Sequence, residues 1–202
     1  MTAEPSAASN GVPRRRQSRR DEILGIAVGL FASRGYHGVS MDDIGGAAGV
    51  TGPALYHHFA GKEAMLIAAL VPVSEGLRAG GRAKVAAAQG DEDALEALVD
   101  FHVEFALDNP AVISVQLNEL DRLPDESRRL IRRLQREYVE EWVTVLTRIR
   151  TGLTPDAARV CAHAAFGLMN STPFLRSPLP RAEMSALLRG MALAALRGDA
   201  VT

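Results

Sequence analysis

Three consecutive polar rings, Tyr56, His57 and His58, lie in the stretch VTGPALYHHF. Leu55 and Phe59 are four residues apart, so on a helix they share one face, which we expect to turn toward the core. Tyr56 and His57 then point outward, and His58 lies near the edge of that face. Exposed rings suit the groove of a nucleic acid, where a ring face meets thymine methyl groups and its OH or NH reaches phosphate oxygens.

Two other interpretations of these rings are weaker. A buried aromatic cluster fits Phe59, but a helix of this length cannot bury all three polar rings. A metal site is suggested by His37, His57 and His58, yet adjacent histidines point to different sides of a helix and no cysteine or HExxH spacing supports them. The sequence therefore predicts no metal site and no cofactor.

Two helices are expected before the rings. The first begins near Arg19, because apolar residues recur at spacings of three and four over residues 23–31, and Gly35 is placed to stop it. Ser40 is expected to cap the second helix, with Asp43 at its third position, where a capping-box acid belongs.

A tight turn at Gly49 leads to a third, short helix that carries the rings. Thr51 is expected to cap this helix, and its first turn tolerates Pro53 because the missing N–H would have no intrahelical partner. Two short helices joined around a glycine predict a helix-turn-helix.

Composition limits the class of protein. The chain has 202 residues, of which 47% are hydrophobic, enough for one medium or two small folded domains. Five arginines within residues 14–20 form a candidate phosphate-contacting arm, and we expect residues 1–18 to be a disordered basic arm.

The sequence predicts a cytoplasmic location and no membrane partner. A single cysteine, Cys161, excludes an intramolecular disulfide, and no run of about 18 apolar residues would span a bilayer. The arginines at residues 14–16 are followed by more charge instead of the apolar core of a signal peptide.

Beyond residue 66 the sequence predicts only helices, since no alternating strand pattern occurs. They are expected from about Asp91 to before Pro110, over residues 111–120, after Pro124 and after Thr154, with a last apolar stripe over residues 184–195. Four arginines lie mostly off the apolar stripe of the helix after Pro124, namely Arg129, Arg132, Arg133 and Arg136. Acidic residues are interleaved with them, so a solvated surface is favoured over a second nucleic-acid-binding face.

The stretch ILGIAVGLFASRGYHGVSMDDIGGAAGVTGPALYHHFAGKEAML, residues 23–66, resembles the DNA-binding domain of the TetR family of bacterial transcriptional repressors. The segments LFASRGY, SMDDIGGAAGV, LYHHF and GKEAML follow one another in the family's order. The resemblance implies an all-α protein with a helix-turn-helix DNA-binding domain at residues 19–62. A helical ligand-binding and dimerisation domain would follow at residues 63–202.

The resemblance also implies the residues that contact DNA. Ser40 and Thr51 would sit near phosphates, residues 56–57 would enter the major groove, and His58 and Lys62 would hold the backbone. The full expected set is Arg19, Ser40, Thr51, Gly52, Pro53, Tyr56, His57, His58 and Lys62.

One position departs from the family pattern. Gly52 stands where many relatives carry a polar or basic side chain that touches a base. Base recognition would then rest more on Tyr56, His57 and Thr51, or on an arm residue such as Arg19.

The helix after Thr154 is apolar nearly all round, so it must be buried on more than one side. One protomer covers one face, and a second protomer would cover the other. The resemblance implies that the last two helices pair with their copies in a four-helix homodimer interface. The residues expected there are Cys161, Ala165, Leu168, Leu187, Leu188 and Met191.

A small-molecule site is expected among the helices between Lys62 and Thr151, because their apolar stripes carry a few polar members. The expected ligand-binding residues are His102, Phe105, Gln116, Glu119, Tyr138 and Trp142. For any one of them the alternative is an ordinary core residue with satisfied hydrogen bonds. The stretches ISVQLNEL and RLIRRLQREYVEEWV resemble the sensor half of actinobacterial family members, some of which answer to acyl-CoA thioesters or other lipid metabolites.

Together these expectations describe a homodimeric repressor that a small hydrophobic effector releases from a pseudo-palindromic, double-stranded DNA operator. Two alternatives stay open. A ligand-independent DNA-binding protein would share the N-terminal half, and an all-helical enzyme would need a nucleophile, a base and an orienting residue, for which no recognisable spacing occurs.

Overall fold

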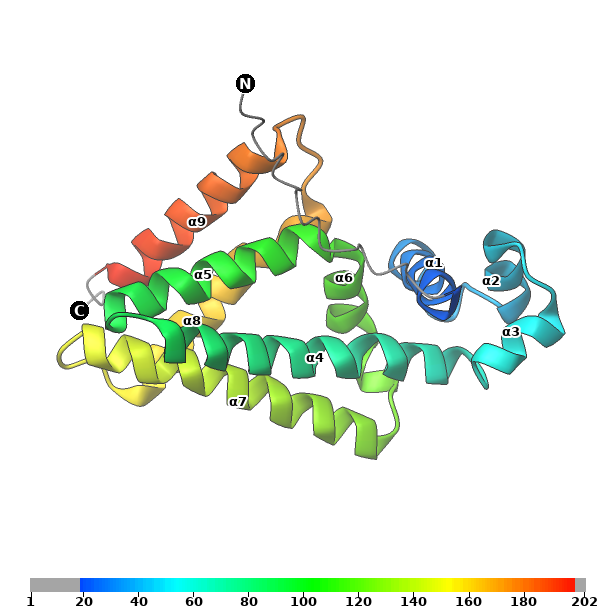
Figure 1. The fold of residues 1–202 in the computed structure, drawn as a ribbon, viewed down its shortest axis with the longest axis horizontal. Helices are drawn as coiled ribbons and strands as arrows, with labels where there is room; N and C mark the ends of the chain where they lie inside the picture. The colour runs from blue at the N-terminus through cyan, green and yellow to red at the C-terminus, as the bar shows by residue number, and fades with distance from the viewer. Residues whose placement is uncertain (1–18, 199–202) are drawn as a thin grey trace, which may run out of the picture.

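The computed structural model describes residues 19–198, and over that range it contains α-helices and short 3-10 helices but no strand (Figure 1). This confirms the predicted all-α fold class, while the expected arm at residues 1–18 lies outside the described residues. The helices are α1 (Arg19–Arg34), α2 (Met41–Ala48), α3 (Gly52–His58), α4 (Lys62–Ala87), α5 (Asp91–Asp108), α6 (Pro110–Glu119), α7 (Asp125–Ile149), α8 (Pro155–Met169) and α9 (Arg181–Arg197), with 3-10 turns η1 (Leu120–Arg122) and η2 (Thr172–Phe174).

Local capping signals set the ends of α2. The Ser40 hydroxyl accepts a hydrogen bond from the Asp43 amide at 3.0 Å, and the Asp43 carboxylate accepts one from the Ser40 amide at 2.8 Å. This is the predicted capping box, and it lowers the pKa of Asp43 because Ser40 hydrogen-bonds to the charged carboxylate. Gly49 ends the helix with a φ of 64°, a left-handed conformation that suits glycine.

The N-terminal core is shared between both halves of the chain. Helices α1, α2 and α3 lie at one end of the molecule, and α4 runs from them into the other half (Figure 1). The buried cluster around Ile23 and Leu55 continues along α4 as far as Leu70 and includes Val115 and Ile131. Helices α1 to α3 therefore share a core with α6 and α7, beyond the boundary expected after residue 62.

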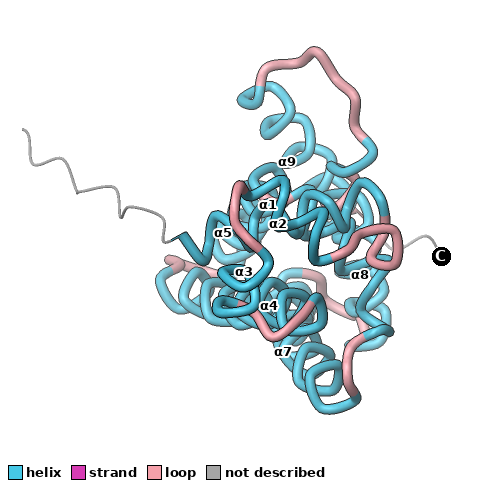
Figure 2. The backbone as a smooth tube through the Cα atoms, turned by 90° about the vertical axis from the view of Figure 1, so that its right-hand side faces the viewer, coloured by secondary structure: helices cyan, strands magenta, loops and turns pink. Residues whose placement is uncertain are grey.

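The second core is formed where α4, α5 and α7 meet α8 and α9. Helix α4 packs on both α5 and α7, and Figure 2 shows this arrangement from the end that carries α1 to α3. Trp142 is fully buried at the centre of this core. The side chains around it form the wall of the cavity described below.

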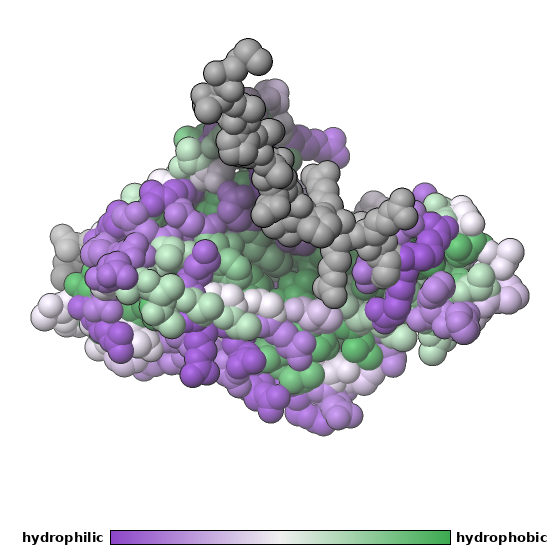
Figure 3. All heavy atoms as spheres, in the orientation of Figure 1, coloured by the Kyte–Doolittle hydropathy of each residue, from purple (hydrophilic) through white to green (hydrophobic). Residues whose placement is uncertain are grey.

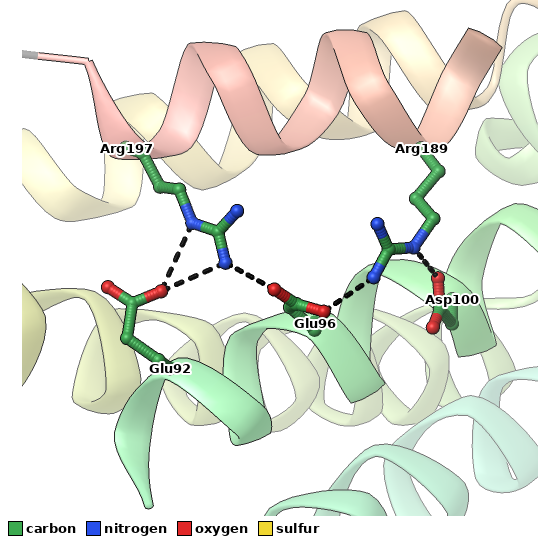
Figure 4. A network of polar contacts seen from close by, with 5 residues as sticks. All are labelled: Glu92, Glu96, Asp100, Arg189 and Arg197. Atoms are coloured by element: carbon green, nitrogen blue, oxygen red, sulfur yellow. Dashed lines mark hydrogen bonds and ion pairs between the residues drawn. The ribbon is translucent and has the colours of Figure 1, made fainter. Parts of the chain in front are cut away.

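Ion pairs tie the last helix to α5 (Figure 4). The Arg189 guanidinium lies 2.6 Å from a carboxylate oxygen of Glu96 and 2.6 Å from one of Asp100. Arg197 pairs with Glu92 at 3.0 Å and with Glu96 at 2.6 Å. Hydrogen bonds from both arginines lower the pKa of Glu96. These exposed ion pairs accompany the burial of the apolar face of α9, which consists of Leu188, Ala192, Leu193 and Leu196.

One helical stretch of the described chain, Gly52–Ala87, is long and apolar enough to cross a membrane by length and composition alone. The sequence analysis found no such run. In the structure this stretch contains α3 and α4, and α4 packs against α1, α5 and α7. Core helices pass the same test, so the stretch is weak evidence for a membrane span.

Two glycines on α4 allow neighbouring helices to approach closely. A Cβ atom at Gly80 would overlap the ring of Phe101 on α5, and one at Gly81 would overlap the ring of Tyr138 on α7. By contrast, no heavy atom lies within 4 Å of a Cβ built at Gly76 on the same helix.

We expect Gly81→Ala to lower the free energy of unfolding by about 1–3 kcal/mol, because the new methyl group displaces the Tyr138 ring. Gly76→Ala is the matched control and should be neutral or stabilising by up to about 1 kcal/mol, since alanine is the better helix former. Urea unfolding followed by Trp142 emission measures both. Equal effects of the two substitutions would contradict the close packing of α4 on α7.

Candidate nucleic-acid interface and ligand cavity

The α3 helix divides its side chains as the sequence predicts. Leu55 is fully buried and Phe59 is 3% exposed, whereas Tyr56 is 56% exposed. His57 is also exposed and His58 is half-buried, with the two rings in edge contact at 5.8 Å between centroids. The helix therefore offers a tyrosine and a histidine to an external partner while two apolar anchors fix its position.

The start of α3 is open to an anion. Thr51 occupies the N-cap position, but its side chain makes no capping hydrogen bond, and Pro53 lies in the first turn. A Cβ built at Gly52 would meet no heavy atom within 4 Å, so the backbone there is accessible. The free N–H groups at a helix start attract phosphate oxygens. The Ser40 hydroxyl, in contrast, is occupied by its capping box.

Arg19 makes its polar contacts inside the domain. Its guanidinium donates to the carbonyl oxygen of Ala48 at the end of α2 and pairs with Glu22 at 2.6 Å. The residue therefore ties α1 to α2, in addition to any contact with DNA.

Lys62 holds the turn between α1 and α2. Its ammonium group donates to the carbonyl oxygens of Tyr36 at 2.7 Å and Val39 at 2.6 Å, and it lies 4.4 Å from the centre of the Tyr36 ring. Two of its three N–H donors are thus engaged within the protein, and the expected contact of Lys62 with the DNA backbone stays a prediction that would use the third.

Glu119 reaches the same turn from α6. Its carboxylate accepts a hydrogen bond from the Tyr36 amide at 3.2 Å and pairs with Arg122, whose guanidinium lies 2.6 Å from the Nε2 atom of His37. Glu119 is 5% exposed. Burial and the nearby carboxylates of Glu63 and Glu119 raise the pKa of Tyr36. Glu119, which was expected to contact a ligand, thus lies at the junction with α1 and is not among the residues that line the cavity described next.

A cavity of about 420 Å³ lies among α5, α6, α7 and α8. Four of the expected ligand residues line it, namely His102, Phe105, Gln116 and Tyr138. Other lining residues were not predicted from the sequence, including Gln135 on α7 and, from the segment after Thr154, His163, Phe166, Asn170 and Phe174. A polar residue on the Ala-rich helix after Thr154 was a signal for His163, but nothing in the sequence placed it beside α7. Among residues 19–198, no group of three His, Cys, Asp or Glu side chains is arranged to hold a metal ion.

A buried polar network forms one wall of the cavity. The Nε2 atom of His102 lies 3.1 Å from the Asn170 side-chain oxygen, and its Nδ1 atom lies 3.2 Å from the Tyr138 hydroxyl. Because an amide oxygen only accepts, this assignment places the proton on Nε2 and has the Tyr138 hydroxyl donate to Nδ1. Burial lowers the pKa of His102 to about 4 and raises the pKa of Tyr138. The imidazole is therefore neutral at physiological pH.

Trp142 lies behind this wall. Its ring meets Phe166 edge-on at 5.0 Å and Tyr138 at 6.1 Å between centroids. The indole Nε1 atom is buried without a hydrogen-bond partner. Trp142, which was expected to contact a ligand, is not among the lining residues, but its emission will report changes in the rings that line the cavity.

The expected dimer residues fall into three groups by exposure. Ala165 and Leu188 are 1% and 7% exposed inside the protomer, so neighbours in the same chain already cover them and they offer little surface to a second copy. Leu187 and Met191 are more than half exposed. Cys161 and Leu168 are half-buried.

The low pKa of His102 predicts a pH dependence of stability. The folded-state value of about 4 lies below the ordinary value of 6.5, so the unfolded chain binds more protons between these pH values. The stability that the neutral ring contributes is thus lost as pH falls from 6.5 toward 4. From pH 7 to 5 we expect wild type to lose about 2 kcal/mol more unfolding free energy than His102→Gln. Denaturant unfolding at both pH values tests this, and equal losses would contradict it.

Comparison with known proteins identifies the family of the chain. Residues 23–69 match the model for bacterial regulatory proteins of the tetR family, and residues 89–174 match that for a tetracyclin repressor-like C-terminal domain. The chain is 33% identical over 147 residues to the HTH-type transcriptional repressor KstR2 of Rhodococcus jostii (strain RHA1), covering 72% of this chain and 70% of that protein. It is 32% identical over 148 residues to the HTH-type transcriptional regulator CymR of Pseudomonas putida, covering 71% and 72%.

Solved structures agree with this match. A TetR-family transcriptional regulator from Bordetella parapertussis 12822 superposes with a TM-score of 0.80 at 26% identity, covering 89% of this chain and 94% of that one. The ketosteroid transcriptional regulator KstR2 of Mycobacterium tuberculosis gives a TM-score of 0.78 at 26% identity, covering 89% and 95%. The chain therefore belongs to the TetR family of bacterial transcriptional regulators, and it is a DNA-binding regulator, not an enzyme.

Proposed function

We propose that this regulator is a cytoplasmic, homodimeric repressor that a small hydrophobic effector releases from its operator. The observation that carries the proposal is the position of α6. One part of this helix lines the cavity through Ile113, Gln116 and Leu117, and its last residue, Glu119, binds the turn between α1 and α2. A single short helix thus touches both the effector site and the recognition domain.

The contact with DNA rests on α3. A two-fold dimer would place one α3 helix in each of two major grooves, about 34 Å apart along the axis or somewhat more, on a pseudo-palindromic site. Tyr56 and His57 would meet base edges, and the Thr51 hydroxyl and the open helix start would bind phosphate. His58 and Pro53 would complete the contact at its edge.

The dimer rests on apolar side chains that the protomer leaves exposed on its last two helices. Val160 on α8 is 69% exposed, and Leu187 and Met191 on α9 are 53% and 56% exposed. Such a surface favours burial against a second copy. Sedimentation tests this: Met191→Glu should convert a dimer to a monomer, and a monomeric wild type at micromolar concentration would refute the interface.

The effector class follows from the lining of the cavity. Aromatic and aliphatic side chains dominate it, and a few polar groups stand among them, as in sites for hydrophobic small molecules. A relative with the same fold is a ketosteroid regulator, which supports a sterol-like or other lipid-like effector, acyl-CoA thioesters included.

Release would follow from movement of α6. An effector shifts the equilibrium between two forms only by its differential affinity for them. A ligand that displaces Gln116 would also displace Glu119, which is less than one helical turn away on the same helix. The hydrogen bond to the Tyr36 amide would then no longer hold the recognition domain in its DNA-binding orientation.

We expect Tyr56→Ala to weaken operator binding by about 1–3 kcal/mol, because the ring would lose its contact with a base. Tyr56→Phe keeps the ring, so it should lose only the part of the operator affinity that the hydroxyl contributes. A gel-shift titration on a fragment selected from random DNA measures both. Unchanged affinity of Tyr56→Ala would show that α3 does not recognise the operator.

A further inference from the structure

A second, smaller cavity adjoins the ligand cavity on the outer side of α7. Its volume is about 220 Å³, and it shares Gln135, Val139 and His163 with the lining of the larger cavity. Its remaining lining residues are all charged, namely Arg132, Arg136, Glu140 and Arg159. We call this space the arginine annex. The two cavities are therefore neighbours, with the three shared residues on their common border.

The annex has an excess of positive charge, because its lining contains three arginines and a single glutamate. Arg159 pairs with Glu140 at 2.7 Å and with Asp156 at 2.9 Å. Arg132 pairs with Asp121 at 2.6 Å. The one acid of the annex is therefore already engaged by Arg159.

Arg136 differs from its neighbours on α7. Arg128 and Arg129 both approach Asp125, and Arg133 lies 3.8 Å from Glu137. Among the residues that the structure describes, Arg136 forms neither an ion pair nor a hydrogen bond. The acidic residues interleaved along α7 favoured a solvated surface in the sequence. In the structure they approach the other arginines, and the Arg136 guanidinium has no partner among the described residues.

The positive surface continues along α7. Arg132 and Arg136 also line a groove with Arg129 and Arg133. Figure 3 shows hydrophilic residues gathering along the lower edge of the molecule, where Figure 1 places α7. An anion in the annex would therefore lie beside Arg132 and Arg136, whereas Arg129 and Arg133 lie outside its lining and approach the carboxylates of Asp125 and Glu137.

We propose that the effector is an anionic amphiphile whose apolar body fills the large cavity and whose carboxylate or phosphate group binds in the arginine annex. This rests on the proposed effector site. Arg136 is the principal anion ligand, with Arg132 beside it one helical turn away. The planar guanidinium donates two parallel hydrogen bonds to either anion, a geometry that a neutral alcohol cannot use. Gln135 and His163 lie at the boundary between the apolar and the charged part.

Three probes that share one alkyl chain test the proposal on the full-length protein: dodecanoate, dodecyl phosphate and dodecanol. Binding is measured by titration calorimetry and by Trp142 emission at constant ionic strength. Wild type should bind at least one of the two anions more tightly than the alcohol. Arg136→Gln should weaken anion binding roughly threefold to tenfold and leave the affinity for dodecanol unchanged.

Arg133→Gln is the matched control, because it removes the same charge from the same helix outside the annex. It should leave the affinity for all three probes within about twofold of wild type. The ratio of the two anion affinities identifies carboxylate or phosphate as the preferred group.

The outcomes separate the annex from the effector site. Equal binding of all three probes to wild type, or equal effects of Arg136→Gln and Arg133→Gln on the anions, would overturn the annex while leaving a hydrophobic effector site in place. Binding of none of the probes would overturn the effector site for alkyl amphiphiles and the annex with it.

Discussion

The turn between α1 and α2 takes its polar partners from helices that come later in the chain, and this constraint fixes the recognition helix relative to the rest of the molecule. Lys62 at the start of α4 binds two carbonyl oxygens of the turn, and Glu119 at the end of α6 binds the Tyr36 amide. Both contacts are at least partly shielded from water, so each contributes more to the stability of the fold than an ion pair on the surface. The recognition domain therefore cannot reorient without breaking contacts with α4 and α6.

Local features of the recognition domain were predictable from the sequence because the signals are local. The capping box of Ser40 and Asp43, the left-handed Gly49 and the buried pair of Leu55 and Phe59 each depend on residues within four positions of one another. The roles of Lys62 and Glu119 depend on partners 26 and 83 positions away, which no spacing encodes. Family resemblance assigned Lys62 to DNA because a lysine at a helix start serves either purpose.

The effector site was only half predictable for a related reason. Periodicity identified the inner faces of α5 and α7, and with them His102 and Tyr138. Periodicity does not give the rotation of α8 relative to α5 and α7. Phe166 and Asn170 were therefore missed, and Ala165 was expected at an interface although it is buried within the protomer. Likewise, the packing of α9 on α5 and α8 places Leu188 inward and Leu187 outward, with exposed ion pairs to α5 beside it. The unpaired positive charge of the arginine annex depends on which acid pairs with which arginine, and the sequence composition does not specify these pairs.

We infer that the Glu119 carboxylate, through its hydrogen bond to the Tyr36 amide, holds α3 in the orientation that binds DNA. The most direct test is the distance between spin labels on the two α3 helices of a dimer, measured by pulsed electron resonance with His57→Cys in a Cys161→Ser background. The account predicts that Glu119→Ala broadens or shifts the distance distribution, because the Tyr36 amide loses its acceptor, whereas Glu126→Ala, at an exposed acid on α7, leaves it unchanged. Identical distributions for wild type and Glu119→Ala would contradict the claim.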